Sequence, residues 1–342
     1  MPTHPTPLAT YLSESLEIMD LHLDIFIPHR LWGYDMFTHN TMHPFGRHFF
    51  THSDIPRMQK GGYSGAMWSI TTNPFRFAGS RWKVFLENLQ KIENLAREHS
   101  DIVAITPRYQ DYLQYPHKHK ILPSIQGANS LEGSPEGIES LPNPSDSIVR
   151  MTLVHLTPSV YGNTSSPFHW LQPKKGLSPQ GKRLIEQMNA RHIFVDLAHA
   201  HPKTFWDAVD VQGKGHPLLV THTGVQGVKK HWRNLDDAQI KAIADTGGVI
   251  GIMFANNFLQ HNHDRSLQIV IEHMEYLINI GGEDVVAFGS DFDGAISPPI
   301  DLYSADQLPN LIDKMVEKGW SEERIANILG RNFLRVFAAY RQ

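Results

Sequence analysis

The sequence contains no cysteine among its 342 residues. Disulfide bonds and thiolate metal sites are therefore excluded, and a metal ion must be held by histidine, aspartate, glutamate, carbonyl groups or water. The chain supplies 21 histidines and 35 acidic residues for that purpose. The lack of thiols thus restricts any metal site to nitrogen and oxygen ligands.

Long apolar runs and an excess of one charge are also missing. No stretch approaches the roughly 20 apolar residues that a membrane-spanning helix needs. The net charge of −4, with 19% charged residues, gives no bulk attraction to nucleic acid or anionic lipid. The first residues form neither a basic nor a continuous apolar segment, so no secretory signal is predicted. We expect a cytoplasmic globular protein with no nucleic-acid or membrane partner.

Apolar, β-branched runs alternate along the chain with segments of helical period. This alternation is typical of strand–helix units around a parallel sheet. The candidate strands are residues 16–24, 63–71, 120–126, 148–155, 192–198, 217–222, 249–254 and 285–290. The clearest helices begin at Ser178-Pro179 or cover residues 236–244, 266–280, 305–317 and 321–337. Eight such units predict an α/β fold, a single (β/α)8 TIM barrel over residues 1–342, with its chemistry at the C-terminal ends of the strands.

Two long connections interrupt the pattern, at Pro28–Ser53 and Ala128–Ser147. Loops of this length in a compact domain are usually functional lids or irregular insertions. The first contains five histidines, which we expect to be solvated or to line the substrate site. They are His29, His39, His43, His48 and His52.

Polar side chains that can bind metal or transfer protons end most of the candidate strands. His22 and Asp24 are two residues apart, so on a strand they point to the same side and can hold one cation. The other residues at strand ends are Gln126, His155, His199, His222 and Asp291. Desolvating so many polar groups at one rim costs free energy unless they have partners. Their convergence predicts a metal-dependent site.

Taken singly, these residues also have structural interpretations. His155 could be a core histidine bonded to a backbone carbonyl, and His199 and His222 could be structural as well. Asp291 could shape a turn, because Asp and Gly often do so. Arg233 could belong to a solvated surface ion pair.

Short motifs that follow one another along nearly the whole chain resemble the membrane dipeptidase (renal dipeptidase, peptidase M19) family of the amidohydrolase superfamily. Any one of these motifs is weak, but the ordered set is highly specific. The matching stretches are residues 19–24, 54–62, 65–69, 151–155, 176–181, 195–199, 221–223, 233–237, 247–251, 289–294 and 328–334.

The resemblance implies a zinc-dependent site. His22 and Asp24 would bind one zinc ion, with Asp291 close to it, and His199 and His222 would bind a second. His155 would contact the substrate carbonyl and its tetrahedral oxyanion, and Arg233 would hold the substrate carboxylate. Asp291 would be the catalytic acid/base. The resemblance also allows a homodimer.

The chain departs from this family at the end of the third candidate strand, where Gln126 replaces a glutamate that bridges two metals. A neutral amide offers one good oxygen ligand and an NH2 group that cannot ligate. Our hypothesis is one tightly bound ion, shared by His22, Asp24, His199 and Asp291, with His222 orienting water and any second ion held weakly. Glutamates 132, 136 and 139 follow in the next loop, where a substitute bridge is not expected.

The predicted activity is hydrolysis of a small dipeptide with a free carboxylate. A metal-bound water would attack the scissile carbonyl, with Asp291 moving the proton. Two alternatives stay open. One is an amidohydrolase acting on a cyclic amide, a lactone or an N-acyl amino acid. The other is a catalytically weakened barrel that binds metal or peptide.

Overall fold

The computed structural model describes residues 5–41, 49–171, 176–260 and 265–342. His43 and His48 of the first long loop therefore lie outside the described residues.

The strands belong to one sheet, and they follow one another along it largely in chain order. The order is β1-β2-β4-β5-β6-β7-β8-β9, with β3 paired to β4. Their bounds are β1 Met19–Leu23, β2 Gly65–Thr71, β3 Val103–Ile105, β4 His119–Gln126, β5 Arg150–Thr152, β6 Phe194–Asp196, β7 Leu218–Thr223, β8 Val249–Ile252 and β9 Val286–Phe288. All eight candidate strands are found, β3 is an addition, and the predicted TIM-barrel-like α/β fold is confirmed.

The chain divides into two compact units. Unit 1 comprises residues 1–68, 221–244 and 249–335, and unit 2 comprises residues 69–220, 245–248 and 336–342. The single domain over residues 1–342 stays a prediction, and each unit is described by itself.

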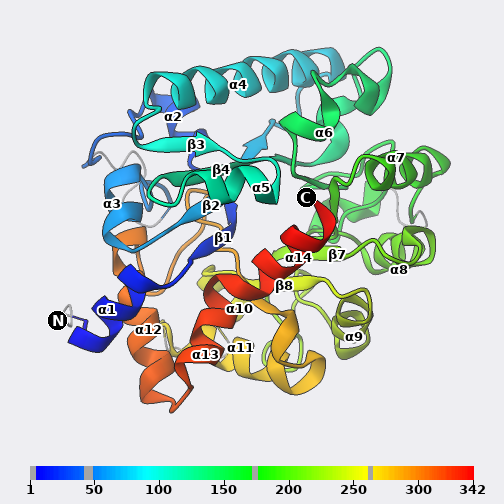
Figure 1. The fold of residues 1–342 in the computed structure, drawn as a ribbon. Coiled ribbons are helices and arrows are strands. Elements are labelled where there is room, and N and C mark those ends of the chain that lie inside the picture. The colour runs from blue at the N-terminus through cyan, green and yellow to red at the C-terminus, as the bar shows by residue number, and fades with distance from the viewer. Residues whose placement is uncertain (1–4, 42–48, 172–175, 261–264) are drawn as a thin grey trace. The chain divides into compact units, whose positions relative to one another are not determined.

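Unit 1 contains the first and the last strand of the chain, β1 and β9. β1 pairs with β2 in parallel, β8 pairs with β9 in parallel, and Leu23 at the end of β1 bridges Phe292 beyond β9. α1 lies beside α12 (Figure 1), where Thr6 N–H donates to Asp313. Helices that lie in this unit wholly or in part are α1 Pro7–Ser15, α2 Phe26–Trp32, α3 Ile55–Lys60, α9 Asp237–Asp245, α10 Asn256–Leu259, α11 Gln268–Gly281, α12 Leu308–Glu317, α13 Glu322–Ala326 and α14 Asn332–Tyr340.

The predicted helix over residues 321–337 is not regular. It begins as predicted, with the Ser321 hydroxyl accepting the Arg324 N–H. A π-helical turn at Asn327–Arg331 then separates α13 from α14. Gly330 lies in this turn, where a side chain would clash with the backbone carbonyl of Glu17. Close packing of the turn against the segment before β1 thus accompanies the irregularity, which hydrophobic period alone does not reveal.

Unit 2 contains the parallel strands β4, β5 and β6. The predicted cap of α7 is present, because the Ser178 hydroxyl accepts the Gly181 N–H at 3.0 Å and Pro179 is the first helical residue. The second long loop contains short 3₁₀ turns at Ala128–Leu131 and Gly137–Ser140. Helices of this unit are α4 Ala78–Glu98, α5 Tyr109–Gln114, α6 Pro144–Ser147, α7 Pro179–Ala190 and α8 Pro202–Gln212.

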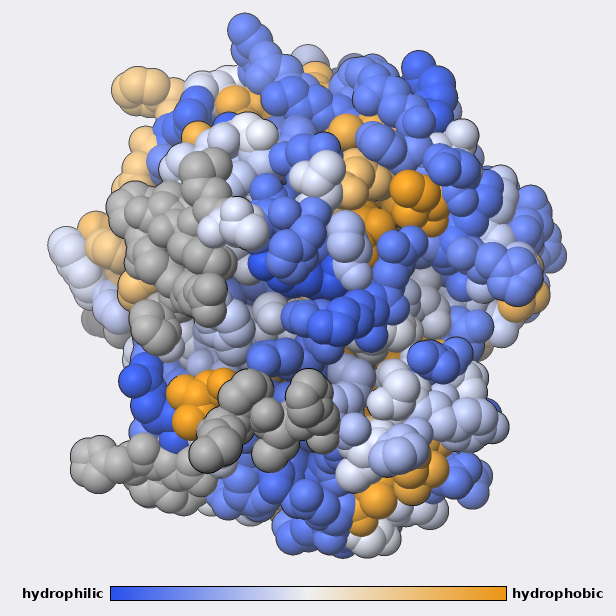
Figure 2. All heavy atoms as spheres, turned by 90° about the vertical axis from the view of Figure 1, so that its left-hand side faces the viewer, coloured by the Kyte–Doolittle hydropathy of each residue, from blue (hydrophilic) through white to orange (hydrophobic). Residues whose placement is uncertain are grey.

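Hydrophilic residues predominate on the face drawn in Figure 2, where the hydrophobic ones form small separate groups. Within the described ranges, no helix is long and apolar enough to cross a membrane.

Candidate metal centre

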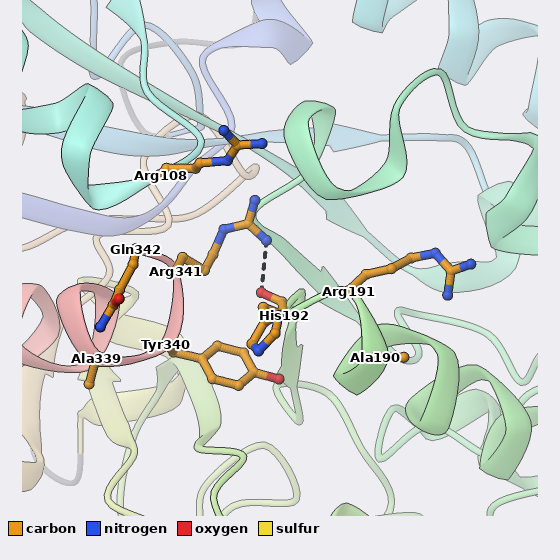
Figure 3. Close-up of a pocket in the computed structure, with 8 residues that line it drawn as sticks. All are labelled: Arg108, Ala190, Arg191, His192, Ala339, Tyr340, Arg341 and Gln342. Carbon is orange, nitrogen blue, oxygen red and sulfur yellow. Dashed lines mark hydrogen bonds between the residues drawn. The ribbon is translucent and has the colours of Figure 1, made fainter.

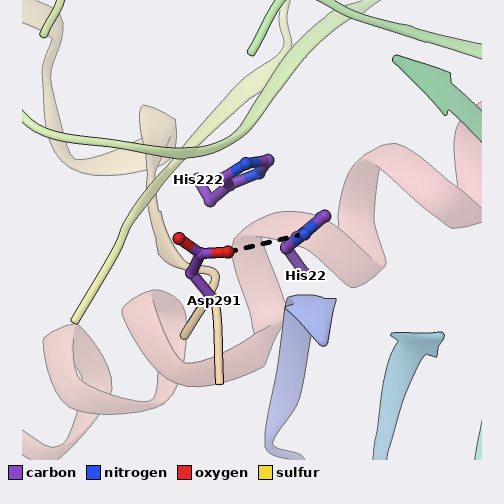
Figure 4. Close-up of side chains that lie close together, drawn as sticks. All are labelled: His22, His222 and Asp291. Atoms are coloured by element: carbon purple, nitrogen blue, oxygen red, sulfur yellow. Dashed lines mark ion pairs between the residues drawn. The ribbon is translucent and has the colours of Figure 1, made fainter. Parts of the chain in front are cut away.

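Three side chains of unit 1 meet at the ends of different segments (Figure 4). His22 is in β1, His222 is in β7 and Asp291 follows β9. Their potential ligand atoms all lie within 4.8 Å of one another, and all three residues are buried. The two imidazole rings stack, with centroids 3.7 Å apart. Among the residues that the structure describes, this is the one group of three or more such side chains close enough to hold a metal ion.

Asp24 completes the group, which we call the acidic cluster: His22, Asp24, His222 and Asp291. The Nε2 atom of His22 lies 3.3 Å from Asp24 Oδ2 and 3.7 Å from Asp291 Oδ1. His22 and His222 are fully buried, whereas Asp291 is 8% exposed. The structure therefore brings four of the five predicted metal ligands together within unit 1, and these four include His222.

Backbone contacts between β1 and the segment after β9 hold the two carboxylates in place. Asp291 N–H donates to the His22 carbonyl at 3.1 Å, and Asp24 N–H donates to the Phe292 carbonyl at 3.0 Å. Asp291 adopts the left-handed conformation, with φ of 61°, which is uncommon outside glycine. Gly294 lies against both acids, because a side chain there would clash with Asp291 and approach Asp24 Oδ2 to 2.9 Å. The turn therefore fixes the position of Asp291 and packs directly against both carboxylates of the acidic cluster.

Asp20 supports this arrangement, and sequence reasoning missed it. Its Oδ1 accepts the backbone N–H groups of His22 at 3.0 Å and Ser290 at 2.8 Å. It therefore ties a predicted metal ligand to the residue before Asp291. The signal was available, because Asp20, His22 and Asp24 share one side of a strand at a spacing of two residues. Burial raises the pKa of Asp20 to about 7, although these hydrogen bonds oppose that rise.

Two further contacts orient His222 and Arg233. The Thr221 hydroxyl lies 3.0 Å from His222 Nδ1; when Nδ1 carries the proton and donates it to this hydroxyl, the lone pair of Nε2 is available to a metal ion. Arg233 is buried, and its Nη2 donates to the His222 carbonyl at 2.6 Å. The alternative interpretation of Arg233 as a solvated surface residue is therefore wrong.

The electrostatics of the acidic cluster fit a cation. The pKa of Asp291 is well above its usual value because burial disfavours the charged form, and the nearby Asp24 carboxylate adds to the effect. Arg233 opposes the rise. Two buried carboxylates side by side repel each other unless a positive charge compensates them. Imidazole nitrogens and carboxylate oxygens are also the ligands that zinc accepts in a protein without cysteine.

His52 and Asp293 form a second buried contact next to the turn that carries Asp291. Asp293 accepts the N–H groups of His52 at 2.9 Å and Ser53 at 3.1 Å, and Asp293 N–H donates to His52 Nδ1 at 3.1 Å. His52 is fully buried, so the expectation that it is solvated or lines the substrate site is wrong. Burial raises the pKa of Asp293 to about 6. The pair anchors the end of the first long loop to the Asp291 turn.

The remaining predicted site residues, Gln126, His155 and His199, lie together in unit 2; we call them the glutamine–histidine group. The Gln126 side-chain oxygen accepts the Thr71 hydroxyl at 2.6 Å, and its NH2 group lies 3.4 Å from His199 Nε2. The rings of His155 and His199 meet edge to face, with centroids 4.7 Å apart. The sharing of a metal ion by His199 stays a prediction.

The glutamates beyond Gln126 have other partners in unit 2. Glu132 forms an ion pair with Arg81 and accepts the Val160 N–H at 2.9 Å. Glu139 forms an ion pair with Arg191. These contacts agree with the expectation that neither residue substitutes for a bridging glutamate.

A cavity of about 420 Å³ also lies in unit 2, where its lining includes Arg108, Arg191, His192 and Arg341 (Figure 3). Arg341 donates to the carbonyls of Pro107 and His192, both at 2.7 Å. Arg108 and Arg191 form ion pairs with Asp146 and Glu139. These contacts tie neighbouring segments of unit 2 together, and the cavity contains none of the predicted site residues.

The fold and the acidic cluster are those of a metal-dependent hydrolase built on a TIM-barrel-like scaffold. The model of the membrane dipeptidase family, peptidase family M19, matches residues 8–342. The chain therefore belongs to this family of metallopeptidases, and the resemblance inferred from its motifs is confirmed.

Three individual proteins illustrate what the chain is similar to. An uncharacterized protein in the pqqA 5′ region of Klebsiella pneumoniae is 41% identical over 165 residues, which cover 47% of this chain and 60% of that protein. A crystal structure of a Rhodobacter sphaeroides metallopeptidase, liganded with a phosphinate mimic of the dipeptide L-Ala-D-Ala, gives a TM-score of 0.82 at 22% identity, over 95% of this chain and 99% of that one. The probable dipeptidase PvdM from Pseudomonas aeruginosa gives 0.81 at 18% identity, over 97% of each chain. These two structural likenesses show the fold.

Proposed function

We propose that this protein is a metallo-dipeptidase that hydrolyses small dipeptides with a free carboxylate. The observation that carries the proposal is the acidic cluster, which combines two imidazoles and two carboxylates in a buried position. Family membership supports the same reaction, and the dipeptide mimic bound to the Rhodobacter relative supports the substrate class.

His22, Asp24, His222 and Asp291 would hold the metal ion. A divalent ion bound there lowers the pKa of water towards neutrality and polarises a carbonyl group. The structure supports a single well-formed centre in unit 1. Gln126 supports the absence of a second tight centre, because an amide cannot bridge two cations as a carboxylate does.

Asp291 is the proposed acid/base of the reaction. Within the acidic cluster it is more exposed than His22 and His222, which are fully buried, so water can reach its carboxylate. Asp291 would accept a proton from the attacking water and pass it to the leaving amine. The turn that fixes its backbone holds the carboxylate in one place for both transfers.

Two further residues are proposed to bind the substrate. Arg233 would pair with the terminal carboxylate, for which a guanidinium offers two parallel donors. His155 would donate to the carbonyl oxygen as negative charge develops on it. The family resemblance supports both roles, and the closeness of Arg233 to the acidic cluster adds support for the first.

A substrate screen combined with elemental analysis tests the proposal. Purified protein is loaded with zinc, freed of excess metal and assayed against dipeptides, N-acyl amino acids, lactones and cyclic amides. We expect hydrolysis of dipeptides and about one tightly held ion per chain. If the protein hydrolyses N-acyl amino acids, lactones or cyclic amides but no dipeptide, the dipeptidase proposal is replaced by the alternative of an amidohydrolase acting on such compounds. Gln126 also motivates this alternative. No turnover of any substrate by the loaded protein would favour a catalytically weakened barrel.

A further inference from the structure

We infer that His199 is not a metal ligand in this chain, and that Thr71 and Gln126 hold its ring as a hydrogen-bonding group for the substrate. The inference rests on the proposed function for the identity of that substrate. It changes the hypothesis drawn from sequence, in which His199 shares the ion with His22, Asp24 and Asp291.

A chain of contacts within unit 2 leads to the ligating atom of His199. The Thr71 hydroxyl at the end of β2 donates to Gln126 Oε1 at 2.6 Å, which fixes the amide at the end of β4. The amide nitrogen then faces His199 Nε2 at 3.4 Å. Gln126 is 2% exposed, so solvent has little access to this contact.

The consequence is the same for either orientation of the glutamine amide. If the NH2 group faces the ring, it donates to the Nε2 lone pair that a metal would need. If the amide oxygen faces the ring, Nε2 must carry a proton and has no lone pair to give. Unlike the Asp24 carboxylate beside His22 Nε2, the neutral Gln126 amide brings no negative charge that would favour a cation at this nitrogen, so a metal ion gains little by displacing the hydrogen bond. The replacement of glutamate by glutamine therefore removes a bridging ligand and also engages the neighbouring histidine.

Backbone contacts place His199 beside His155 instead. The Thr164 hydroxyl contacts the carbonyls of both histidines, at 3.2 Å for His199, and Ser165 N–H donates to the His199 carbonyl at 2.7 Å. His199 has a φ of 65°, a conformation that costs a non-glycine residue free energy unless its surroundings enforce it. Each histidine is 8% exposed, whereas His22 and His222 are fully buried. The slight solvent exposure that both histidines retain is what contact with a substrate requires.

Measuring the bound metal distinguishes a metal-binding histidine from a substrate-binding one without an activity assay. We would prepare H199A and H222A, load both with zinc, remove excess metal and measure bound zinc by elemental analysis, with thermal unfolding to verify that each variant is folded. We expect H199A to keep about one ion per chain and H222A to lose most of it, because only the second variant removes a ligand. Loss of the ion from H199A would overturn the inference.

Two further variants test the contacts that join Thr71 to Gln126 and Gln126 to His199. Q126E replaces the amide by a carboxylate and should raise the bound zinc to about two ions per chain; a Q126E protein that still holds one would overturn the role given to Gln126. T71V should keep one ion yet raise KM for a dipeptide by about threefold, with kcat less affected, since one hydrogen bond is lost. An unchanged KM in both T71V and H199A would overturn the substrate role. Failure of the wild-type protein to cleave dipeptides while metal contents follow the expected pattern would instead count against the proposed function.

Discussion

Units 1 and 2 use the same local device at the end of a strand and give it different electrostatic surroundings. Asp20 in β1 accepts the N–H of His22 at 3.0 Å, and Asp196 in β6 accepts the N–H of Ala198 at 3.0 Å. Each aspartate thereby fixes the backbone two residues further on, close to a histidine of the predicted site. In both units a buried carboxylate orients a functional strand end.

The two carboxylates differ in what balances their charge. Asp196 lies 3.2 Å from Arg150 and accepts the Thr152 hydroxyl at 2.7 Å, and both members of this ion pair are fully buried. In the described part of the chain Asp20 forms no ion pair, and burial raises its pKa to about 7. Asp196 thus has a buried cation in direct contact, whereas unit 1 combines Asp20, Asp24 and Asp291 with two imidazoles and one nearby arginine, Arg233, which only partly offsets the rise in the pKa of Asp291. The difference explains why the acidic cluster fits an external cation.

The largest predicted effect separates chemistry from metal binding in the acidic cluster. Replacing Asp291 by Asn keeps an oxygen ligand but removes the proton acceptor. We expect kcat to fall by about 10²–10⁴-fold, the usual worth of general acid/base catalysis. Zinc should stay bound by elemental analysis. Near-normal turnover in D291N would remove Asp291 from the mechanism.

The internal cation of unit 2 can be removed by replacing Arg150 with Met. The Asp196 carboxylate would be left buried without its partner, which costs about 3–5 kcal/mol of unfolding free energy. The measurement is the shift in the urea unfolding midpoint. The matched control is R150M together with D196L, which removes both charges and should recover most of the loss. Equal destabilisation by both variants would show that side-chain volume, not charge, dominates here.

Crowding the acidic cluster tests whether its geometry matters as much as its charge. An alanine at Gly294 would clash with Asp291 and approach Asp24, although no charge is altered. We expect zinc affinity to fall by about 10–100-fold, as when groups that orient metal ligands are lost. Gly79→Ala is the control, because its added methyl group meets nothing within 4 Å. Unchanged zinc affinity in G294A would mean that the turn can accommodate the added methyl group without displacing Asp291 and Asp24.

Local sequence patterns predicted the fold well and included all four residues of the acidic cluster among the candidate ligands, but the single-ion hypothesis grouped His199, and not His222, with His22, Asp24 and Asp291. Period-two spacing marked His22 and Asp24, and apolar runs located the strands, because both depend on neighbours in the chain. Partners distant in sequence were harder. Nothing near His52 indicates that it is buried against Asp293, and the contact of Thr71 with Gln126 joins two strands. The grouping of His222 with His22 likewise depends on how β7 and β1 are placed in space.

The smallest predicted effect concerns Asp20, the member of the comparison that lacks a cation. Asp20→Asn keeps an oxygen that can accept the N–H groups of His22 and Ser290, so zinc affinity should change by less than about threefold. Asp20→Ala removes that acceptor and should weaken zinc binding by about tenfold. Calorimetric titration of zinc into the metal-free variants measures both. If D20N were as impaired as D20A, the charge of Asp20 would matter more than its hydrogen bonds, and the parallel with the charge-paired Asp196 would become closer.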